Sequence, residues 1–190
     1  MPNVYDFDET VIYPDSGREF IRFCQRRHFL RTLPWMLPLG FQALRFAWNR
    51  KRGLPVRGDF YRFLRSLPDW REEVRLFWEA NADAFLKPWF LAQLRPGDIV
   101  ISCSPEFLLR PLCERLGLRL AATRVNLDSG KYRLDGNSCH GSEKVRRLRE
   151  AFGEVEIDEF YSDSLDDAPL AKLAKRAWLV TGDERVPWPK

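Results

Sequence analysis

The feature that most constrains this chain is a pair of aspartates near its N-terminus, in the run Val4-Tyr5-Asp6-Phe7-Asp8. A short apolar stretch leads into the pair, which is typical of a buried strand that ends where the aspartates begin. Two carboxylates at a strand end suit Mg²⁺, and they also suit phosphoryl transfer, in which one carboxylate attacks and the other moves a proton. Solvated turns carry the same pattern, so this interpretation needs partners from the rest of the chain.

Length and composition indicate a globular protein with a well-buried core. The chain has 190 residues, of which 45% are hydrophobic and 14% are aromatic, and this composition excludes a disordered chain. Its four cysteines show no zinc-like spacing, so we expect reduced thiols. A cleavable targeting peptide would remove Asp6, and we therefore expect a cytoplasmic protein.

Strand-like and helical segments alternate along the chain. Ser16 with Glu19, and Asp69 with Glu72, form capping boxes that predict helix starts. We expect strands over 99–101, 118–127 with a hairpin turn at 128–130, 156–161 and 177–180, and helices over 39–48, 60–67, 105–116 with Ser104 as N-cap, 141–152 and 170–174. The alternation predicts an α/β fold, a Rossmann-like parallel sheet with helices on both faces.

The segment between the first strand and the second is helical throughout, from about Ser16 to Phe85. We therefore predict a helical cap, residues 14–87, inserted into a catalytic core formed by residues 1–13 and 88–190. Such a cap can close over a site, exclude water and select the leaving group.

Polar side chains follow the predicted strands or begin the next helix. The set consists of Asp6, Asp8, Ser102, Lys144, Asp163 and Asp167. In parallel sheets ligands bind beyond the carboxyl ends of the strands, so we expect these side chains to meet at one edge. Together they supply a nucleophile, an acid/base, a hydroxyl, a cation and carboxylates for a metal, which a phosphoryl-transfer site needs.

These motifs, in this order, resemble the four motifs of the haloacid dehalogenase superfamily. The residues that carry the resemblance are Asp6-Phe-Asp8-Glu-Thr10, Ser102, Lys144 and Ser162-Asp163-Ser-Leu-Asp-Asp167. The insert after the first motif looks like the type-1 helical cap of the phosphoserine-phosphatase-like subfamily IB. The resemblance implies a Mg²⁺-dependent phosphomonoester hydrolase that acts on a small phosphorylated metabolite through an aspartyl-phosphate intermediate.

The resemblance also implies a role for each catalytic residue. Asp6 would attack phosphorus, and Asp8 would protonate the leaving oxygen and then activate water. Asp8 favours a phosphatase, because the dehalogenases lack this second aspartate. Ser102 would hydrogen-bond the phosphoryl group, and Lys144 would pair with Asp6 and the phosphoryl oxygens.

The same resemblance implies a metal site and substrate contacts. Mg²⁺ would lie on Asp6, the backbone carbonyl of Asp8 and Asp163, and Asp167 would orient either the metal's water shell or Lys144. Asp166 is the alternative if the motif shifts by one residue. The expected substrate contacts are Thr10, Asp15, Cys103, Ser104 and His140. Serine-specific relatives carry a Glu where this chain has Asp15-Ser16, which argues against phosphoserine as the substrate.

A basic and apolar stretch in the cap leaves three interpretations open. Residues 22–58 contain no Asp or Glu and favour an anionic partner. Residues 29–52 could contact an anionic membrane surface, at the inner membrane, where a phosphatidylglycerophosphate-like lipid would be the substrate; lipid phosphatases of that kind occur in this neighbourhood of the superfamily. The favoured interpretation is packing between cap helices, because Pro34 and Pro38 interrupt any amphipathic period. A non-enzymatic nucleic-acid-binding module is the least favoured.

Overall fold

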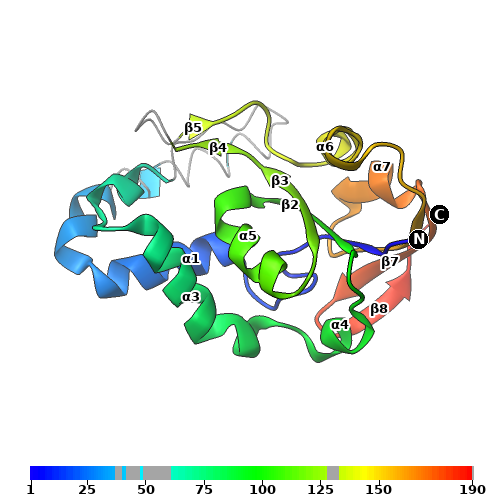
Figure 1. Ribbon diagram of the computed structural model, residues 1–190, viewed down its shortest axis with the longest axis horizontal. Helices are drawn as coiled ribbons and strands as arrows, with labels where there is room; N and C mark the ends of the chain where they lie inside the picture. Colours follow the sequence, from blue (N-terminus) through cyan, green and yellow to red (C-terminus); the bar gives the residue numbers. More distant parts are fainter. Residues whose placement is uncertain (37–39, 42–47, 49–60, 128–132, 190) are drawn as a thin grey trace.

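A computed structural model describes residues 1–36, 40–41, 48, 61–127 and 133–189 (Figure 1). Its strands are β1 (Val4–Tyr5), β2 (Ile99–Pro105), β3 (Arg119–Thr123), β4 (Val125–Asn126), β5 (Arg133–Leu134), β6 (Ile157–Ser162), β7 (Ala174–Thr181) and β8 (Glu184–Pro187). Its helices are α1 (Ser16–Arg27), η1 (Arg62–Ser66), α3 (Trp70–Phe85), α4 (Pro88–Gln93), α5 (Glu106–Arg115), α6 (Ser142–Phe152), η2 (Leu165–Asp167) and α7 (Ala168–Ala171). Residues 29–36 are also helical.

The predicted α/β architecture is confirmed. The main sheet has the order β3-β2-β1-β6-β7-β8, in which the first five strands are parallel and β8 pairs antiparallel with β7. The two-residue strand β1 lies between β2 and β6, with Tyr5 opposite Val100 on one side and Tyr161 on the other. The N-terminal residues therefore occupy the middle of the sheet, and the carboxyl ends of three strands lie side by side.

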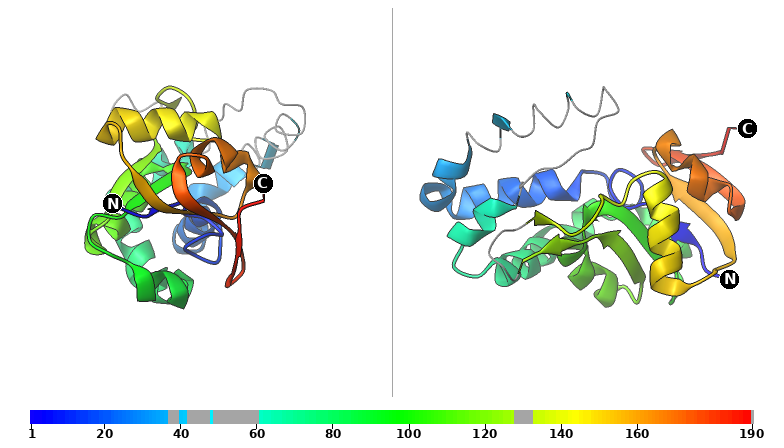
Figure 2. Two further views of the ribbon diagram at one scale, coloured as in Figure 1. Left: turned by 90° about the vertical axis from the view of Figure 1, so that its right-hand side faces the viewer. Right: turned by 90° about the horizontal axis from the view of Figure 1, so that it is seen from above.

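The two residues of β1 point to opposite faces of the sheet, as strand geometry requires. Tyr5 belongs to the hydrophobic cluster that includes side chains of α4 and α5, and its ring stacks on Tyr161 at 5.0 Å. Val4 belongs to the other cluster, which includes Leu148 of α6 and Leu170 of α7. Helices thus cover both faces (Figure 2), which is the arrangement that a buried parallel sheet needs.

The chain segments that enter and leave the helical insert run antiparallel and pair with each other. Ile12 forms an isolated bridge with Leu86, and the amide of Tyr13 donates to the carbonyl of Phe85 at 3.0 Å. From these paired segments α1 and α3 extend together away from the sheet, toward the left of Figure 1. We refer to this insert as the cap; that it covers a site stays a prediction.

Cap and core side chains form one continuous hydrophobic cluster. Phe77 and Trp78 of α3 lie in the same cluster as Phe7, which follows β1, and Leu108 of α5. Trp78 is 2% exposed, its ring meets that of Phe7 edge-on at 5.9 Å, and its indole N–H donates to the carbonyl of Leu108 at 2.6 Å. Trp78 therefore anchors the cap to the core by both apolar and polar contacts.

Two predicted N-caps are displaced by one residue. Asp15, not Ser16, caps α1, and its carboxylate accepts from the amide of Arg18 at 2.7 Å. Ser104 lies within β2, and Pro105 takes the N-cap position of α5. The amide of Ser16 and the hydroxyl of Ser104 both donate to Asp8. At Ser104 this tertiary hydrogen bond outweighs the local preference for capping. The third predicted cap, Asp69 of α3, is confirmed.

Several predicted boundaries differ from the structure. The segment predicted as one strand over 118–127 is divided into β3 and β4, and β4 pairs with β5 in a hairpin. The helix predicted through 170–174 ends at Ala171, because Ala174 begins β7 opposite Ile157. Strand β8 was not predicted. The helix predicted over 39–48 and the turn at 128–130 lie largely outside the described residues. Within the described ranges, no helix is long and apolar enough to cross a membrane.

Replacing Trp78 with Ala tests the shared core. We expect the free energy of unfolding to fall by about 3–5 kcal/mol, because the change leaves a cavity and an unpaired Leu108 carbonyl. Urea denaturation followed by circular dichroism measures the effect. Leu165→Ala, at a side chain that is 56% exposed, is the matched control and should change stability by less than about 0.5 kcal/mol. An unchanged midpoint for Trp78→Ala would contradict the shared core.

Candidate active site

Parallel pairing brings the predicted site residues to one edge of the sheet. Asp6 follows β1 directly, and its amide donates to the carbonyl of Tyr161 in β6 at 2.8 Å. Ser102 lies two residues beyond Val100, the β2 partner of Tyr5, and Asp163 follows the end of β6. Residues about 95 and 155 positions apart in the sequence are thus brought together by the sheet order, as the sequence predicted.

Lys144 is the central cation of the site. It begins α6, it is 2% exposed, and its Nζ lies 2.8 Å from Asp6 Oδ1 and 2.6 Å from Asp167 Oδ2. Ser162 also donates to Asp167, at 2.7 Å. Burial opposes the charge on Lys144, but the two carboxylates outweigh it and raise the pKa of the ammonium above its ordinary value. Lys144 therefore stays charged beside Asp6.

Asp167, rather than Asp166, completes this ion triad. Asp167 is 2% exposed and faces Lys144, whereas the side chain of Asp166 is 53% exposed and lies 3.3 Å from His140 Nε2. Of the two roles considered for Asp167, the structure supports the orientation of Lys144.

The two aspartates of the first motif have different partners. Asp8 accepts from the amide of Ser16 at 2.6 Å and from the hydroxyl of Ser104 at 2.5 Å. Burial raises the pKa of Asp8 to about 6, although the hydrogen bonds from Ser104 and Ser16 oppose the rise. Burial likewise raises the pKa of Asp6, and Lys144 opposes that rise. Asp8 can therefore exchange a proton near neutral pH, as a general acid/base must.

Asp163 is held in place by Thr10. The Thr10 hydroxyl donates to Asp163 Oδ1 at 2.9 Å, and Thr10 Oγ1 in turn accepts from the amide of Asp163 at 2.9 Å. Thr10 is fully buried, so it positions Asp163 and is not an open substrate contact. The negative charge of Asp163 also raises the pKa of Asp6, so the two carboxylates lie in one site.

These donors fit Mg²⁺ better than a metal that needs a protein cage. Within the described ranges, no three His, Cys, Asp or Glu side chains form a metal-binding group. The site offers two carboxylates, Asp6 and Asp163, whose charges act on each other. Mg²⁺ is typically bound through one or two carboxylates and keeps several waters, so the donor set suits this ion.

Comparison with known proteins decides the family. Residues 4–172 match the family model of the haloacid dehalogenase-like hydrolases. The chain belongs to this family. It is 30% identical over 183 residues to protein CicA of Caulobacter vibrioides, a match that covers 90% of this chain and 81% of CicA.

Several solved structures share the fold of this chain. A Bordetella pertussis protein of unknown function superposes with a TM-score of 0.70 at 21% identity, over 93% of this chain and 87% of that one. A phosphoserine phosphohydrolase-like protein from Francisella tularensis gives 0.55 at 15% identity, over 93% and 86%. A probable phosphoserine phosphatase from Vibrio cholerae gives 0.54 at 15% identity, over 93% and 55%.

The remaining candidate residues are spread around the family motifs. Ser102 is 1% exposed, and its hydroxyl accepts from the amide of Ser104 at 3.0 Å. Ser104 itself contacts Asp8, so its role is to hold that carboxylate. Cys103 is exposed, with its sulfur 3.0 Å from the hydroxyl of Ser138. Asp15 caps α1, and His140 faces Asp166.

Tyr61 is a cap residue near the site that the sequence analysis missed. A Cβ atom on Gly17 would lie 2.9 Å from the Tyr61 hydroxyl and 3.5 Å from Asp15 Oδ1, so Gly17 makes room for the phenol. Burial, and then the charges of Asp15 and Asp8, raise the pKa of Tyr61 well above its ordinary value, so it remains a donor. The contact forms where the chain comes back to α1 from the cap, so no local sequence pattern predicts it.

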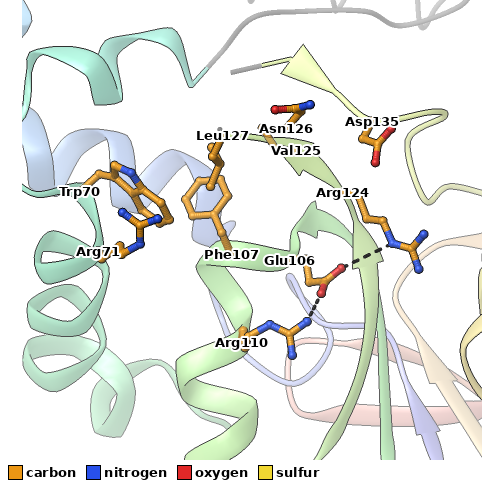
Figure 3. A pocket seen from close by; sticks show the side chains of 10 residues that line it. All are labelled: Trp70, Arg71, Glu106, Phe107, Arg110, Arg124, Val125, Asn126, Leu127 and Asp135. Atoms are coloured by element: carbon orange, nitrogen blue, oxygen red, sulfur yellow. Dashed lines mark hydrogen bonds and ion pairs between the residues drawn. The ribbon is translucent and has the colours of Figure 1, made fainter. Parts of the chain in front are cut away.

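A pocket of about 380 Å³ lies beside the site, between α3, α5 and the β4–β5 hairpin (Figure 3). Trp70 and Phe107 line it, and Glu106 pairs there with Arg110 and Arg124. No candidate site residue is among the described residues that line it, so this pocket is not the reaction centre.

The raised pKa of Asp8 predicts a particular dependence of stability on pH. Because the folded-state pKa, about 6, exceeds the ordinary value of 3.8, the folded protein holds this proton more tightly than the unfolded chain. The resulting stability is present at low pH and is lost as pH rises from about 4 to about 6. Asp8→Asn has no such titration. In chelator-treated samples, the free energy of unfolding of the wild type should fall relative to Asp8→Asn by on the order of 3 kcal/mol between about pH 4 and about pH 7.

Urea denaturation of both proteins over this range measures the difference and cancels the other titrating groups. A difference that does not change with pH would contradict the buried environment assigned to Asp8.

Proposed function

We propose that this hydrolase is a Mg²⁺-dependent phosphatase that cleaves phosphomonoesters through an aspartyl-phosphate on Asp6. The observation that carries the proposal is the division of tasks between the two aspartates. Lys144 lies 2.8 Å from Asp6 and favours its anionic form against the burial that raises its pKa, whereas Asp8 is held by Ser16 and Ser104 and can carry a proton. A nucleophile and an acid/base so close in sequence serve formation and hydrolysis of the same intermediate.

The chain's own residues account for each step. Asp6 Oδ attacks phosphorus while protonated Asp8 donates to the leaving oxygen, so the alcohol departs neutral. Asp8 then takes a proton from the water that attacks the aspartyl-phosphate and releases phosphate. Lys144, oriented by Asp167, offsets charge on Asp6 and on the phosphoryl oxygens. Mg²⁺ held by Asp6, Asp163 and the Asp8 carbonyl would add further charge neutralisation.

Similar proteins and the shape of the cap support a small phosphorylated metabolite as the substrate. Two of the similar structures are described as phosphoserine phosphatase-like, and their likeness to this chain lies in the fold. The Tyr61 hydroxyl of the cap lies against Gly17, and the charges of Asp15 and Asp8 both act on it, so a leaving group bound at Asp8 would meet these polar side chains. The negative charge of Asp15 would favour a leaving group without a carboxylate.

Phosphate release from a panel of soluble esters tests the proposal. The panel holds 4-nitrophenyl phosphate, phosphoserine and other small phosphometabolites, each with Mg²⁺ or with chelator. We expect Mg²⁺-dependent release that Asp6→Asn abolishes and that Asp8→Asn lowers by about 10²–10⁴-fold on alkyl esters. Asp166→Asn, at an exposed neighbouring carboxylate, should retain activity. Equal activity of wild type and Asp6→Asn would overturn the catalytic assignment.

A second candidate, a lipid phosphatase at a membrane surface, has one specific observation in its favour. The packing interpretation of residues 29–36 holds for Trp35, which packs against the cap cluster, but not for three apolar side chains. Phe29, Leu30 and Leu33 are 54%, 82% and 47% exposed. Arg31, also exposed, adds positive charge beside them, which suits an anionic bilayer.

Vesicle binding separates this candidate from the first. If the second candidate is right, the protein should sediment with vesicles of anionic phospholipid in low salt, and Phe29→Ser with Leu30→Ser should weaken binding at least tenfold. Leu165→Ser, equally apolar and exposed elsewhere, is the control. Release of phosphate from phosphatidylglycerophosphate vesicles alone would favour the lipid substrate, whereas no sedimentation would remove the second candidate.

A further inference from the structure

Lys87 is a buried cation outside the sequence motifs. It follows the C-cap of α3 and precedes Pro88 of α4, where the chain returns from the cap to the core. The side chain is among the largest of the fully buried ones, and Lys87 is 1% exposed. Within the described part of the chain Lys87 forms no ion pair. Its Nζ lies 5.5 Å from the centroid of the Tyr13 ring, and burial lowers the pKa of this ammonium, although the charge of Asp183 opposes the fall. A cation that is buried at such a cost is expected to have a structural or catalytic role.

The ammonium of Lys87 donates to two backbone carbonyls. One belongs to Glu9, at 2.6 Å, and the other to Gly182 in the β7–β8 turn, at 2.7 Å. The backbone amide of Lys87 also donates to the carbonyl of Val11 at 3.0 Å. Lys87 therefore ties the loop that follows β1 to the cap linker and to the far hairpin of the sheet.

The loop that Lys87 holds contains the residue with the most unusual backbone. Glu9 has a φ of 58°, and among the described residues it is the only non-glycine with a positive φ. This conformation is unfavourable for a residue with a Cβ and persists when the surroundings enforce it. Glu9 stands between Asp8 and Thr10, so the direction of its carbonyl fixes how these two side chains leave the backbone.

We propose that Lys87 is a positioning residue, which holds Glu9 in its left-handed conformation and thereby aims Asp8 at the leaving oxygen and Thr10 at Asp163. A neutral side chain of the same size would leave two inward-facing carbonyls unpaired, and Glu9 would relax toward a negative φ. The inference rests on the proposed phosphatase function and assigns to that reaction a residue that no motif contains.

The leaving group provides a readout that general instability does not affect. An alkyl phosphate needs a proton on its leaving oxygen and depends on Asp8, whereas 4-nitrophenolate leaves readily without one. Lys87→Met keeps the length of the side chain and removes its donors. We expect the kcat of this variant on the reactive alkyl ester found in the panel to fall by about 10²-fold, with a much smaller loss on 4-nitrophenyl phosphate. Asp8→Asn should show the same selectivity, and Lys172→Met, at an exposed lysine, should show neither loss.

A second substitution tests the backbone argument directly. Glycine adopts a positive φ without strain, and the Glu9 side chain is exposed, with only a 3.7 Å contact to Arg18. Glu9→Gly in the Lys87→Met background should therefore recover at least tenfold of the lost kcat on the alkyl ester. If Lys87→Met does not fold, Lys87→Gln is measured with the same two substrates. Because its amide keeps N–H donors for the carbonyls, it should retain most of the kcat on the alkyl ester, and an equal loss on both esters would overturn the inference.

The outcomes separate this inference from the proposed function. A wild type that releases no phosphate from either ester overturns the phosphatase proposal, and the role of Lys87 with it. An active wild type whose Lys87 variant loses both esters equally, or loses only thermal stability, overturns the inference alone. Selective loss on the alkyl ester, with recovery by Glu9→Gly, supports it.

Discussion

The site of this protein depends on one buried ion triad, in which Lys144 lies between Asp6 and Asp167. The three groups come from three separate elements, and each is largely hidden from water, so none could remain charged there alone. Removal of Lys144 would leave two buried carboxylates without a counter-charge, which ties the position of α6 to the ends of β1 and β6. The electrostatics of Asp6 are therefore set by the sheet order, which places these strand ends together.

A second network, centred on Asp8, links the core to the cap. Ser104 reaches Asp8 from the end of β2, and the amide of Ser16 reaches it from the first turn of α1. One carboxylate thus contacts both parts of the protein at the point where a leaving group would stand. The contacts of Trp78 with Phe7 and Leu108 keep the cap in this position. The geometry around Asp8 therefore depends on how the cap packs against the core.

Much of this site could be predicted from the sequence because strand ends carry its polar residues. Asp6, Asp8, Ser102, Lys144 and Asp163 were each expected at the carboxyl edge of a parallel sheet, and the structure places them there. The predicted N-caps Ser16 and Ser104 were wrong. At α1 the preceding Asp15, an equally favourable cap residue, takes the position. At Ser104 the hydroxyl bonds a buried carboxylate instead, which is worth more than the roughly 1 kcal/mol of a cap. Thr10 was expected at the substrate, but it contacts Asp163, 153 positions away, a partner that no local pattern reveals.

The sequence by itself determined the family and the α/β class and predicted which groups would react, because these follow from residue types and from spacings that are local to single strands and helices. Only the tertiary structure decided that Asp167 rather than Asp166 faces Lys144, which residues hold Asp8, that Tyr61 lies against Gly17 of α1, and that Lys87 reaches the loop after β1. The physical reason is that these contacts join chain segments tens of residues apart. Their geometry is fixed by packing between elements, which no pattern within one element specifies.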